Sequence, residues 1–403
     1  MYVLRLTLVT ETLVTGGAET FVLRLARALR DRGHYVSLFV LRGDLLDRDL
    51  LLSIAPDVPL DAFHIPLLRI VMAFDGLMYR LGLKFCLLRF LQVRCLKLYL
   101  KASNKQIVHS HLLTADIVTA RACKAVGLPW VTTMHGDYLA FESEGGNRAA
   151  RIQDFRAVVR EVEASVKQLV SITDQQVNQL KELMPRADAQ GRICKIYNGY
   201  DAPPRDSLKL SLPEVLRCIP PHAFVIGMVA RGIRDKGWDV MLAAYIALDI
   251  PDAWLVLVGD GDDLQLLRTQ VIHPRIIFTS TVTDPLRYIA RFDLGCMPSR
   301  IPTESLPTVI IEYMLLGKPV IATDVGEVSR MINPQDNCVA GVLLSLGSVE
   351  DMTQQMQSAI ERLYRNSSER ERLAKGALWA VGRFDMDLCV SRYLAVYQAA
   401  CDE

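Results

Sequence analysis

Residues 298–326 read PSRIPTESLPTVIIEYMLLGKPVIATDVG, and this stretch carries most of the information about the fold. It has the order of a strand end, a proline-containing loop, an apolar helix and a second apolar strand. Glu304 lies in the loop and Glu312 interrupts the helix. A carboxylate in such a helix costs free energy unless something binds it. The pair therefore predicts a ligand site; the alternative is a solvated Glu304 and a Glu312 paired with a base such as Lys318.

The start of this predicted helix also favours a ligand. Pro307 suits the first helical turn, and we expect Ser305 or Thr303 to be the cap. Free backbone N–H groups at a helix N-terminus attract anions. The stretch therefore predicts a diphosphate at the helix start, with a carboxylate on each side of it.

Strand-like apolar runs alternate with helical patterns over most of the 403 residues. This alternation predicts parallel sheets covered by helices, and 51% hydrophobic residues are enough for two domains with separate cores. The strands of the two halves are expected at 3–9, 35–41, 107–111, 129–136 and 169–173, and at 224–231, 253–261, 275–281, 294–299 and 318–326. Two proline pairs within residues 201–221 predict the linker between the halves.

Composition excludes several classes of protein. Lys and Arg number 46 against 45 Asp and Glu, so no net field indicates a nucleic-acid partner. The nine cysteines are scattered and form no CxxC pair, which favours a reducing compartment and argues against zinc or a disulfide framework. His109 and His111 face the same side of a predicted strand, which alone does not indicate a metal. We therefore expect no metal site.

Two features concern membranes. No run of about 18 uncharged apolar residues is present, and the first residues lack the pattern of a signal peptide, so a cytoplasmic protein is expected. Residues 67–105 combine many basic residues with apolar ones and contain one acid, Asp75. This pattern predicts a basic amphipathic helix on an anionic bilayer; the alternative is an interior-facing helix with snorkelling basic side chains.

Three further motifs follow predicted strands. Gly16 and Gly17 open a helix after the first strand, which lets backbone approach a phosphate; the alternative is a tight turn. The absence of a GxGxxG motif argues against a dinucleotide site. Arg231 and Lys236 follow residues 224–230 and could clamp a diphosphate, or be surface charges. His135 ends the fourth strand, where it faces the ligand crevice of an open sheet or caps the turn.

In order along the chain, these motifs resemble the retaining group 1 (family 4) glycosyltransferases, whose GT-B fold is α/β. The resemblance rests on GGAE (16–19), HSH (109–111), TMHG (133–136), IYNGYD (196–201), ARGIRDKG (230–237), LVGDG (257–261) and the opening stretch. It implies two doubly wound Rossmann-like domains with a deep interdomain cleft. Residues 1–205 would bind the acceptor and 206–385 the nucleotide-sugar donor, and the helix over 386–403 could pack back on the first domain.

The resemblance also implies roles for individual residues. Glu304 would contact sugar hydroxyls, and Glu312 would hold the ribose. The pyrophosphate would lie on Arg231 and Lys236. Val282 would contact the base, and the backbone of Ser305 and Leu306 would contact the sugar and the phosphate. The opposing wall, near the reacting sugar and the acceptor, would consist of Gly16, Gly17 and His135. This chain departs from the family pattern at two places: Ser305-Leu306-Pro307 replaces the usual Gly-Phe-Gly, and Gly326-Glu327 replaces Gly-Gly. The resemblance therefore does not identify which sugar is transferred.

The expected activity is transfer of a hexose, with retention, from a UDP- or GDP-type sugar to a hydroxyl of a lipid-linked or growing surface glycan. Glu304, His135, Arg231 and Lys236 are the expected catalytic residues, and no cofactor is expected. The protein would be cytoplasmic and could bind the inner face of the plasma membrane through residues 67–105. Two alternatives are a nucleotide-sugar epimerase of the same fold and a non-catalytic sugar-binding protein at the membrane surface.

Overall fold

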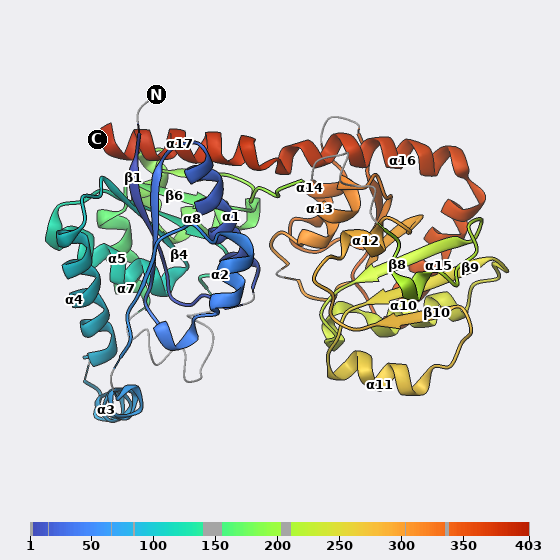
Figure 1. Ribbon diagram of the computed structural model, residues 1–403, viewed down its shortest axis with the longest axis horizontal. Helices are drawn as coiled ribbons and strands as arrows, with labels where there is room; N and C mark the ends of the chain where they lie inside the picture. Colours follow the sequence, from blue (N-terminus) through green and yellow to red (C-terminus); the bar gives the residue numbers. More distant parts are fainter. Residues whose placement is uncertain are drawn as a thin grey trace. The chain divides into compact units, whose positions relative to one another are not determined.

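The computed structural model describes residues 3–14, 16–65, 67–83, 85–139, 155–202, 211–302, 304–334 and 338–402. The chain divides into two compact units (Figure 1). Unit 1 comprises Met1–Asp201 together with Met386–Glu403, and unit 2 comprises Ala202–Asp385. Each unit is an α/β layer structure built on one parallel sheet. Residues 203–210 of the predicted linker lie outside the described residues.

Unit 1 holds seven parallel strands in the order β3-β2-β1-β4-β5-β6-β7. The strands are β1 (Arg5–Thr10), β2 (Tyr35–Val40), β3 (Leu60–Ala62), β4 (Ile107–His111), β5 (Trp130–Met134), β6 (Gln168–Ser171) and β7 (Ile193–Lys195). The described helices are α1 (Gly17–Asp31), α2 (Arg48–Ile54), α3 (Leu68–Arg80), α4 (Leu87–Ala102), α5 (Leu113–Val126), α7 (Phe155–Ser165), α8 (Asp174–Leu183), α9 (Pro185–Ala189) and α17 (Met386–Asp402), together with the 3₁₀ turn η1 (Gly43–Leu45).

The sheet of unit 1 is buried on both faces, as its continuous apolar strands require. One face packs against α1, α2 and α17, and the other against α4, α5 and α7 (Figure 1). β1 lies between β2 and β4, with Leu8 opposite both Leu38 and His109. The strand order thus reverses at β1, which places a topological switch point there.

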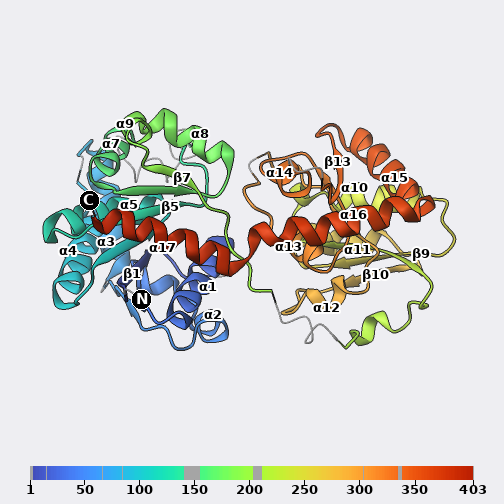
Figure 2. The same cartoon turned by 90° about the horizontal axis from the view of Figure 1, so that it is seen from above.

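The last helix of the chain is part of unit 1. α17 contacts α1, β4 and β5 and lies along the same face of the sheet as α1 (Figure 2). Tyr393 and Tyr397 on this helix are fully buried. At its first turn, a Cβ on Gly199 would lie 2.8 Å from the Met386 Cα, so this glycine lets the IYNGYD turn approach the helix closely.

Unit 2 holds six parallel strands in the order β10-β9-β8-β11-β12-β13. The strands are β8 (Phe224–Val229), β9 (Ala253–Val258), β10 (Ile276–Thr279), β11 (Leu294–Met297), β12 (Val320–Thr323) and β13 (Gly341–Leu344). The helices are α10 (Trp238–Ile246), α11 (Asp262–Gln270), α12 (Leu286–Ile289), α13 (Thr308–Leu315), α14 (Val328–Ile332), α15 (Val349–Arg365) and α16 (Ser367–Ala380), with the 3₁₀ turns η4 (Glu214–Leu216), η5 (Arg234–Lys236) and η6 (Val381–Phe384).

Two groups of helices cover the sheet of unit 2. α10 and α15 contact each other and share a core with β8, β9 and β11 on one face. On the other face, α13 contacts α12 and α16, and α14 contacts α16 (Figure 1). Tyr313 on α13 joins this second layer to the sheet, because its hydroxyl accepts from the Val229 N–H at 3.0 Å and donates to the Cys296 carbonyl at 3.2 Å.

The basic segment 67–105 is not one helix, so that prediction is wrong. α3 and α4 are separated by Leu81–Cys86, where Gly82 has φ +69°. Asp75, the only acid of the segment, lies in α3 and caps the start of α4. Its carboxylate accepts from the Leu87 N–H at 2.6 Å and from the Leu88 N–H at 3.0 Å. A carboxylate at these free N–H groups stabilises the start of α4. Lys84 lies outside the described residues.

Candidate functional site

The predicted donor residues of unit 2 follow neighbouring strands at a topological switch point. β8 and β11 are paired, and the chain continues from β8 to β9 on one side and from β11 to β12 on the other. Ligands of open α/β sheets bind at the carboxyl ends of strands where the order reverses in this way. Arg231 and Lys236 follow β8, and Glu304 follows β11.

Lys236 and Glu304 form an ion pair in the structure. The Lys236 Nζ contacts the Glu304 Oε1, and their side chains are 14% and 12% exposed. The hydroxyl of Ser299 donates to the same carboxylate oxygen at 2.9 Å. Ser299 is fully buried and follows shortly after the last residue of β11, Met297, in the sequence. Ser299 was not predicted from the sequence. The one feature that could have indicated it is its hydroxyl, which lies between the end of a strand and the loop that carries Glu304.

Close backbone approaches hold the loops of this site together. Gly237 has φ +79°, and a Cβ there would lie 2.0 Å from the Pro298 carbonyl oxygen. Gly326 has φ +54°, and its Cβ would lie 1.6 Å from the Glu304 carbonyl oxygen. Only glycine fits both the conformation and the space at these positions. The loops after β8, β11 and β12 therefore form one packed unit around Glu304.

Arg300 ties the loop after β11 to the loop after β8. Its guanidinium donates to the Asp239 carboxylate at 2.8 and 3.0 Å and to the Arg234 carbonyl at 2.6 Å. Its own N–H donates to the Asp235 carbonyl at 2.7 Å. A guanidinium with several fixed acceptors restrains both loops, and the restrained segment includes Lys236.

The helix α13 begins differently from the prediction. Pro307, expected in the first turn, is itself the N-cap residue, so Ser305 is not the N-cap, and Pro307 has no side-chain capping hydrogen bond. Thr303, the other expected cap, lies outside the described residues. The Pro307 carbonyl accepts from the Ile310 N–H at 3.1 Å, but the proline side chain provides no acceptor for the first N–H groups of the helix. Glu312 lies in the second turn of α13 and is buried.

The other predicted donor residues lie at the same edge of the sheet. The Arg231 side chain is exposed, and its carbonyl accepts from the Trp238 indole N–H at 2.9 Å. Ser305 and Leu306 are half-buried between Glu304 and α13, and Val282 is half-buried in the loop after β10. The structure thus places all of the predicted donor residues of unit 2 in loops at strand ends or, for Glu312, on α13.

Gly16, Gly17 and His135 belong to unit 1. Gly16 is the N-cap of α1 and Gly17 is its first residue. A Cβ on Gly16 would lie 2.4 Å from a Glu19 carboxylate oxygen, and the other Glu19 oxygen accepts from the Thr12 hydroxyl at 3.1 Å. The Glu19 carboxylate therefore lies beside the N-terminus of α1, where we expected a phosphate.

His135 is half-buried and belongs to a group of aromatic rings at the carboxyl ends of β4 and β5. Its Nε2 is 3.0 Å from the His111 Nδ1, and the two rings stack with centroids 5.2 Å apart. The ring of Phe21 packs at a tilt against that of His135, with centroids 5.5 Å apart. Burial lowers the pKa of His135 to about 3 and lowers the pKa of His111 well below its usual range. Both imidazoles are therefore neutral at pH 7 and can donate or accept a hydrogen bond.

The histidines of the HSH motif have structural partners. His109 contacts the Tyr397 hydroxyl and the Thr133 hydroxyl, both at 2.8 Å, and its ring packs at a tilt against that of His111, with centroids 4.1 Å apart. Thr133 is also 3.0 Å from the Tyr393 hydroxyl. This network connects β4 and β5 to α17. Within the described residues, no group of three or more His, Cys, Asp or Glu side chains could hold a metal ion.

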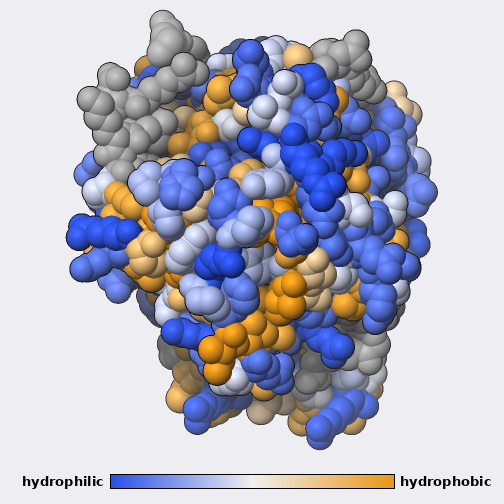
Figure 3. Space-filling model, turned by 90° about the vertical axis from the view of Figure 1, so that its right-hand side faces the viewer, coloured by the Kyte–Doolittle hydropathy of each residue, from blue (hydrophilic) through white to orange (hydrophobic). Residues whose placement is uncertain are grey.

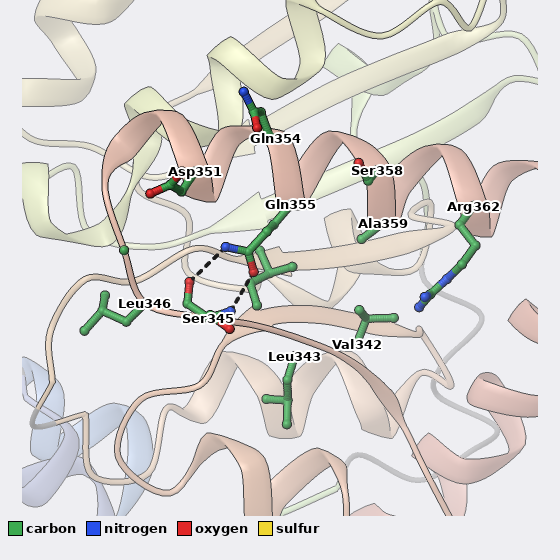
Figure 4. A pocket seen from close by; sticks show the side chains of 12 residues that line it. Val342, Leu343, Ser345, Leu346, Asp351, Gln354, Gln355, Ser358, Ala359 and Arg362 are labelled. Atoms are coloured by element: carbon green, nitrogen blue, oxygen red, sulfur yellow. Dashed lines mark hydrogen bonds between the residues drawn. The ribbon is translucent and has the colours of Figure 1, made fainter.

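A hollow of about 690 Å³ lies elsewhere in unit 2, between the edge strand β13 and α15 (Figure 4). Gln355 crosses it, accepting from the Ser345 N–H at 2.8 Å and donating to the Ser345 carbonyl at 3.3 Å. None of the predicted donor residues lines this hollow. Convergent charged groups, which mark the switch-point site, matter more than volume for binding a diphosphate.

Comparison with known proteins identifies the family of the chain. The family model described as Glycosyltransferase Family 4 matches residues 15–202, and the one described as Glycosyl transferases group 1 matches residues 223–366. A phosphatidyl-myo-inositol mannosyltransferase of Mycobacterium leprae is 26% identical, covering 96% of this chain and 93% of the relative. A 2-deoxystreptamine N-acetyl-D-glucosaminyltransferase of Streptomyces fradiae is 24% identical, with coverages of 96% and 91%.

Solved structures share the fold. The structure of Anabaena HepE in complex with UDP-glucose has a TM-score of 0.71 and 20% identity, covering 97% of this chain and 99% of that one. The apo form of the lipopolysaccharide outer core galactosyltransferase WaaB has a TM-score of 0.68 and 17% identity, covering 98% and 99%. The two parallel-sheet units are thus the two Rossmann-like domains of the GT-B architecture, as predicted.

Proposed function

The chain belongs to the group 1 (family 4) glycosyltransferases of the GT-B fold, which use nucleotide sugars, and we propose that it transfers a hexose with retention of anomeric configuration. The donor would be a UDP or GDP sugar, and the acceptor a hydroxyl of a lipid-linked or growing surface glycan. The observation that carries this proposal is the convergence of Lys236, Glu304 and the α13 N-terminus at the β8/β11 switch point.

In the proposed reaction, the bond from the anomeric carbon to the diphosphate breaks, and the acceptor oxygen bonds to the same face of the sugar. Negative charge develops on the leaving phosphate, where Arg231, Lys236 and the first N–H groups of α13 would stabilise it. The leaving phosphate would take the acceptor proton. These groups supply positive charge themselves, and we therefore propose a reaction that needs no metal ion.

The proposed sugar and ribose contacts come from carboxylates. Glu304 would bind sugar hydroxyls, and Glu312 would hold the ribose hydroxyls, with about 1.5–3 kcal/mol for each hydrogen bond to a charged group. The backbone of Ser305 and Leu306 would contact sugar and phosphate, and Val282 the base. In unit 1, the neutral imidazole of His135 would bind a hydroxyl of the reacting sugar or the acceptor, beside Gly16 and Gly17.

The exposed surface of α3 and the start of α4 supports a membrane-proximal acceptor. Val71 is the one buried residue among the thirteen of α3. The large apolar residues exposed around the two helices are Leu67, Ile70, Phe74, Leu77, Tyr79, Leu81, Leu83, Phe85, Phe90 and Leu98. On the face of unit 2 in Figure 3, by contrast, small hydrophobic areas are separated by hydrophilic ones. An apolar surface with the exposed cations Arg69, Arg80 and Arg94 suits an anionic bilayer.

We accordingly propose that the protein acts at the cytoplasmic surface of a membrane. No helix in the described part of the chain is long and apolar enough to cross a bilayer. Flotation with vesicles containing anionic lipid should carry the wild-type protein upward, and Phe74→Glu with Leu77→Glu should reduce this at least fivefold. Equal flotation of this variant, or with neutral vesicles, would contradict the proposal.

The activity is tested by a nucleotide-release assay against UDP-, GDP- and ADP-sugars, with Glu312→Ala and Lys236→Ala as controls. Release from one donor, lost in both variants, with retained configuration of the product by NMR, is the expected result. Free sugar or an isomer formed without an acceptor would instead favour the epimerase. Absence of both release and nucleotide binding would favour the non-catalytic sugar-binding protein.

A further inference from the structure

Lys236 and Glu304 contact each other, although the proposed function assigns them to different parts of the donor. Their ion pair is largely shielded, with exposed fractions of 14% and 12%. A shielded pair holds its partners more strongly than a fully solvated surface pair. A diphosphate that binds Lys236 must therefore compete with the Glu304 carboxylate.

Ser299 provides the carboxylate with a contact that does not depend on Lys236. Its hydroxyl donates to the Glu304 Oε1 at 2.9 Å and accepts from the Ile301 N–H at 3.4 Å. Ser299 is fully buried next to β11, so its hydroxyl is fixed in position. Both contacts involve Oε1, and Oε2 makes no hydrogen bond with the described part of the chain. Oε2 is thus the oxygen that remains for a sugar hydroxyl.

We propose that Lys236 exchanges partners during donor binding, from the Glu304 carboxylate to the donor diphosphate, and that Ser299 is the positioning residue that keeps Glu304 in place during this exchange. The proposal rests on the proposed function, since it requires a diphosphate at Lys236. It has a consequence for selectivity. A free nucleoside diphosphate leaves Glu304 without a compensating partner, whereas an intact donor provides sugar hydroxyls. The site therefore favours the donor over its product.

Equilibrium binding of UDP, GDP and ADP to the full chain, measured by calorimetry, tests the exchange. Glu304→Gln keeps the shape of the side chain and removes the charge that competes for Lys236. The nucleotide that binds the wild type should bind this variant about tenfold more tightly, which is about 1.4 kcal/mol. Asp235→Asn is the matched control, because it removes an exposed carboxylate next to Lys236. It should change the affinity less than about twofold.

A double-mutant cycle separates the exchange from a general change in charge. In a Lys236→Met background, Glu304→Gln should no longer tighten nucleotide binding. Ser299→Ala tests the positioning role through a different pair of measurements. Its nucleotide affinity should stay within about twofold of wild type, whereas turnover of the donor should fall about tenfold. A purely structural role of Ser299 would weaken both together.

The outcomes distinguish this inference from the proposed function. If the wild type binds a nucleotide and turns over its sugar, but Glu304→Gln binds no more tightly than Asp235→Asn, the exchange of partners is wrong and the proposed function stands. The same holds if Glu304→Gln tightens binding equally in the Lys236→Met background. If the wild type neither binds a nucleotide nor turns over a donor, the proposed function itself fails.

Discussion

Gly326 controls the position of Glu304 without touching any ligand. Its φ is +54°, and an added Cβ would lie 1.6 Å from the Glu304 carbonyl oxygen. Gly326→Ala must therefore move that oxygen by about 1.4 Å to reach 3.0 Å, the shortest approach that real Cβ atoms show. The left-handed conformation adds about 1–2 kcal/mol of strain. A 1 Å misplacement near the reacting groups can cost about 10²-fold in rate, and we expect this loss in kcat.

Gly317→Ala is the matched control for this strain. Gly317 also lies in unit 2 with φ +64°, but its Cβ would meet only the flexible end of Leu378, at 3.3 Å. Both variants should lower Tm by about 2–8 °C, and only Gly326→Ala should lose about 10²-fold in the donor-turnover assay. If the kcat of Gly326→Ala is within about threefold of that of Gly317→Ala, the reasoning about the Glu304 loop is refuted.

Two further predictions concern buried groups of unit 1. Asp116 is fully buried, accepts from Ser110 and Thr132, both at 2.6 Å, and burial raises its pKa to about 6. This pKa exceeds the value of 3.8 for the unfolded chain, so the contribution of Asp116 to the free energy of unfolding is fully present below pH 3.8. It is lost, by about 3 kcal/mol, as the pH rises through 6. Asp116→Asn should remove this pH dependence in urea unfolding, and an unchanged dependence of stability on pH would contradict the prediction. Tyr397→Phe leaves the buried His109 Nδ1 without its partner and should cost about 1–3 kcal/mol; a loss under 0.5 kcal/mol in the same assay would show that the contact is dispensable.

The long strands could be predicted from sequence because each is a continuous apolar run. β1, β4 and β9 are buried over nearly their full length, so the pattern was strong. β3 and β7 were missed, since each has three residues and lies at a sheet edge, where partial burial leaves no apolar run. β13, with two half-buried residues, was missed for the same reason.

The single basic helix failed as a prediction because periodicity does not show where a helix stops. The apolar spacing continues through Gly82, but the Asp75 carboxylate caps a new helix at Leu87, and this contact exists only in the folded chain. Ser299 was not predicted for a similar reason, because its contact also forms only in the folded chain. Its contact with Glu304 depends on how the loop after β11 folds, which residue types alone do not specify.

The central claim is that a nucleotide diphosphate binds at the β8/β11 switch point of unit 2. A crystal structure of the protein soaked with the nucleotide that it releases tests this most directly. We expect the diphosphate at Lys236 and Arg231 beside the N-terminus of α13, with the ribose hydroxyls on Glu312. Density for the nucleotide in the hollow between β13 and α15, with the switch point empty, would contradict the account.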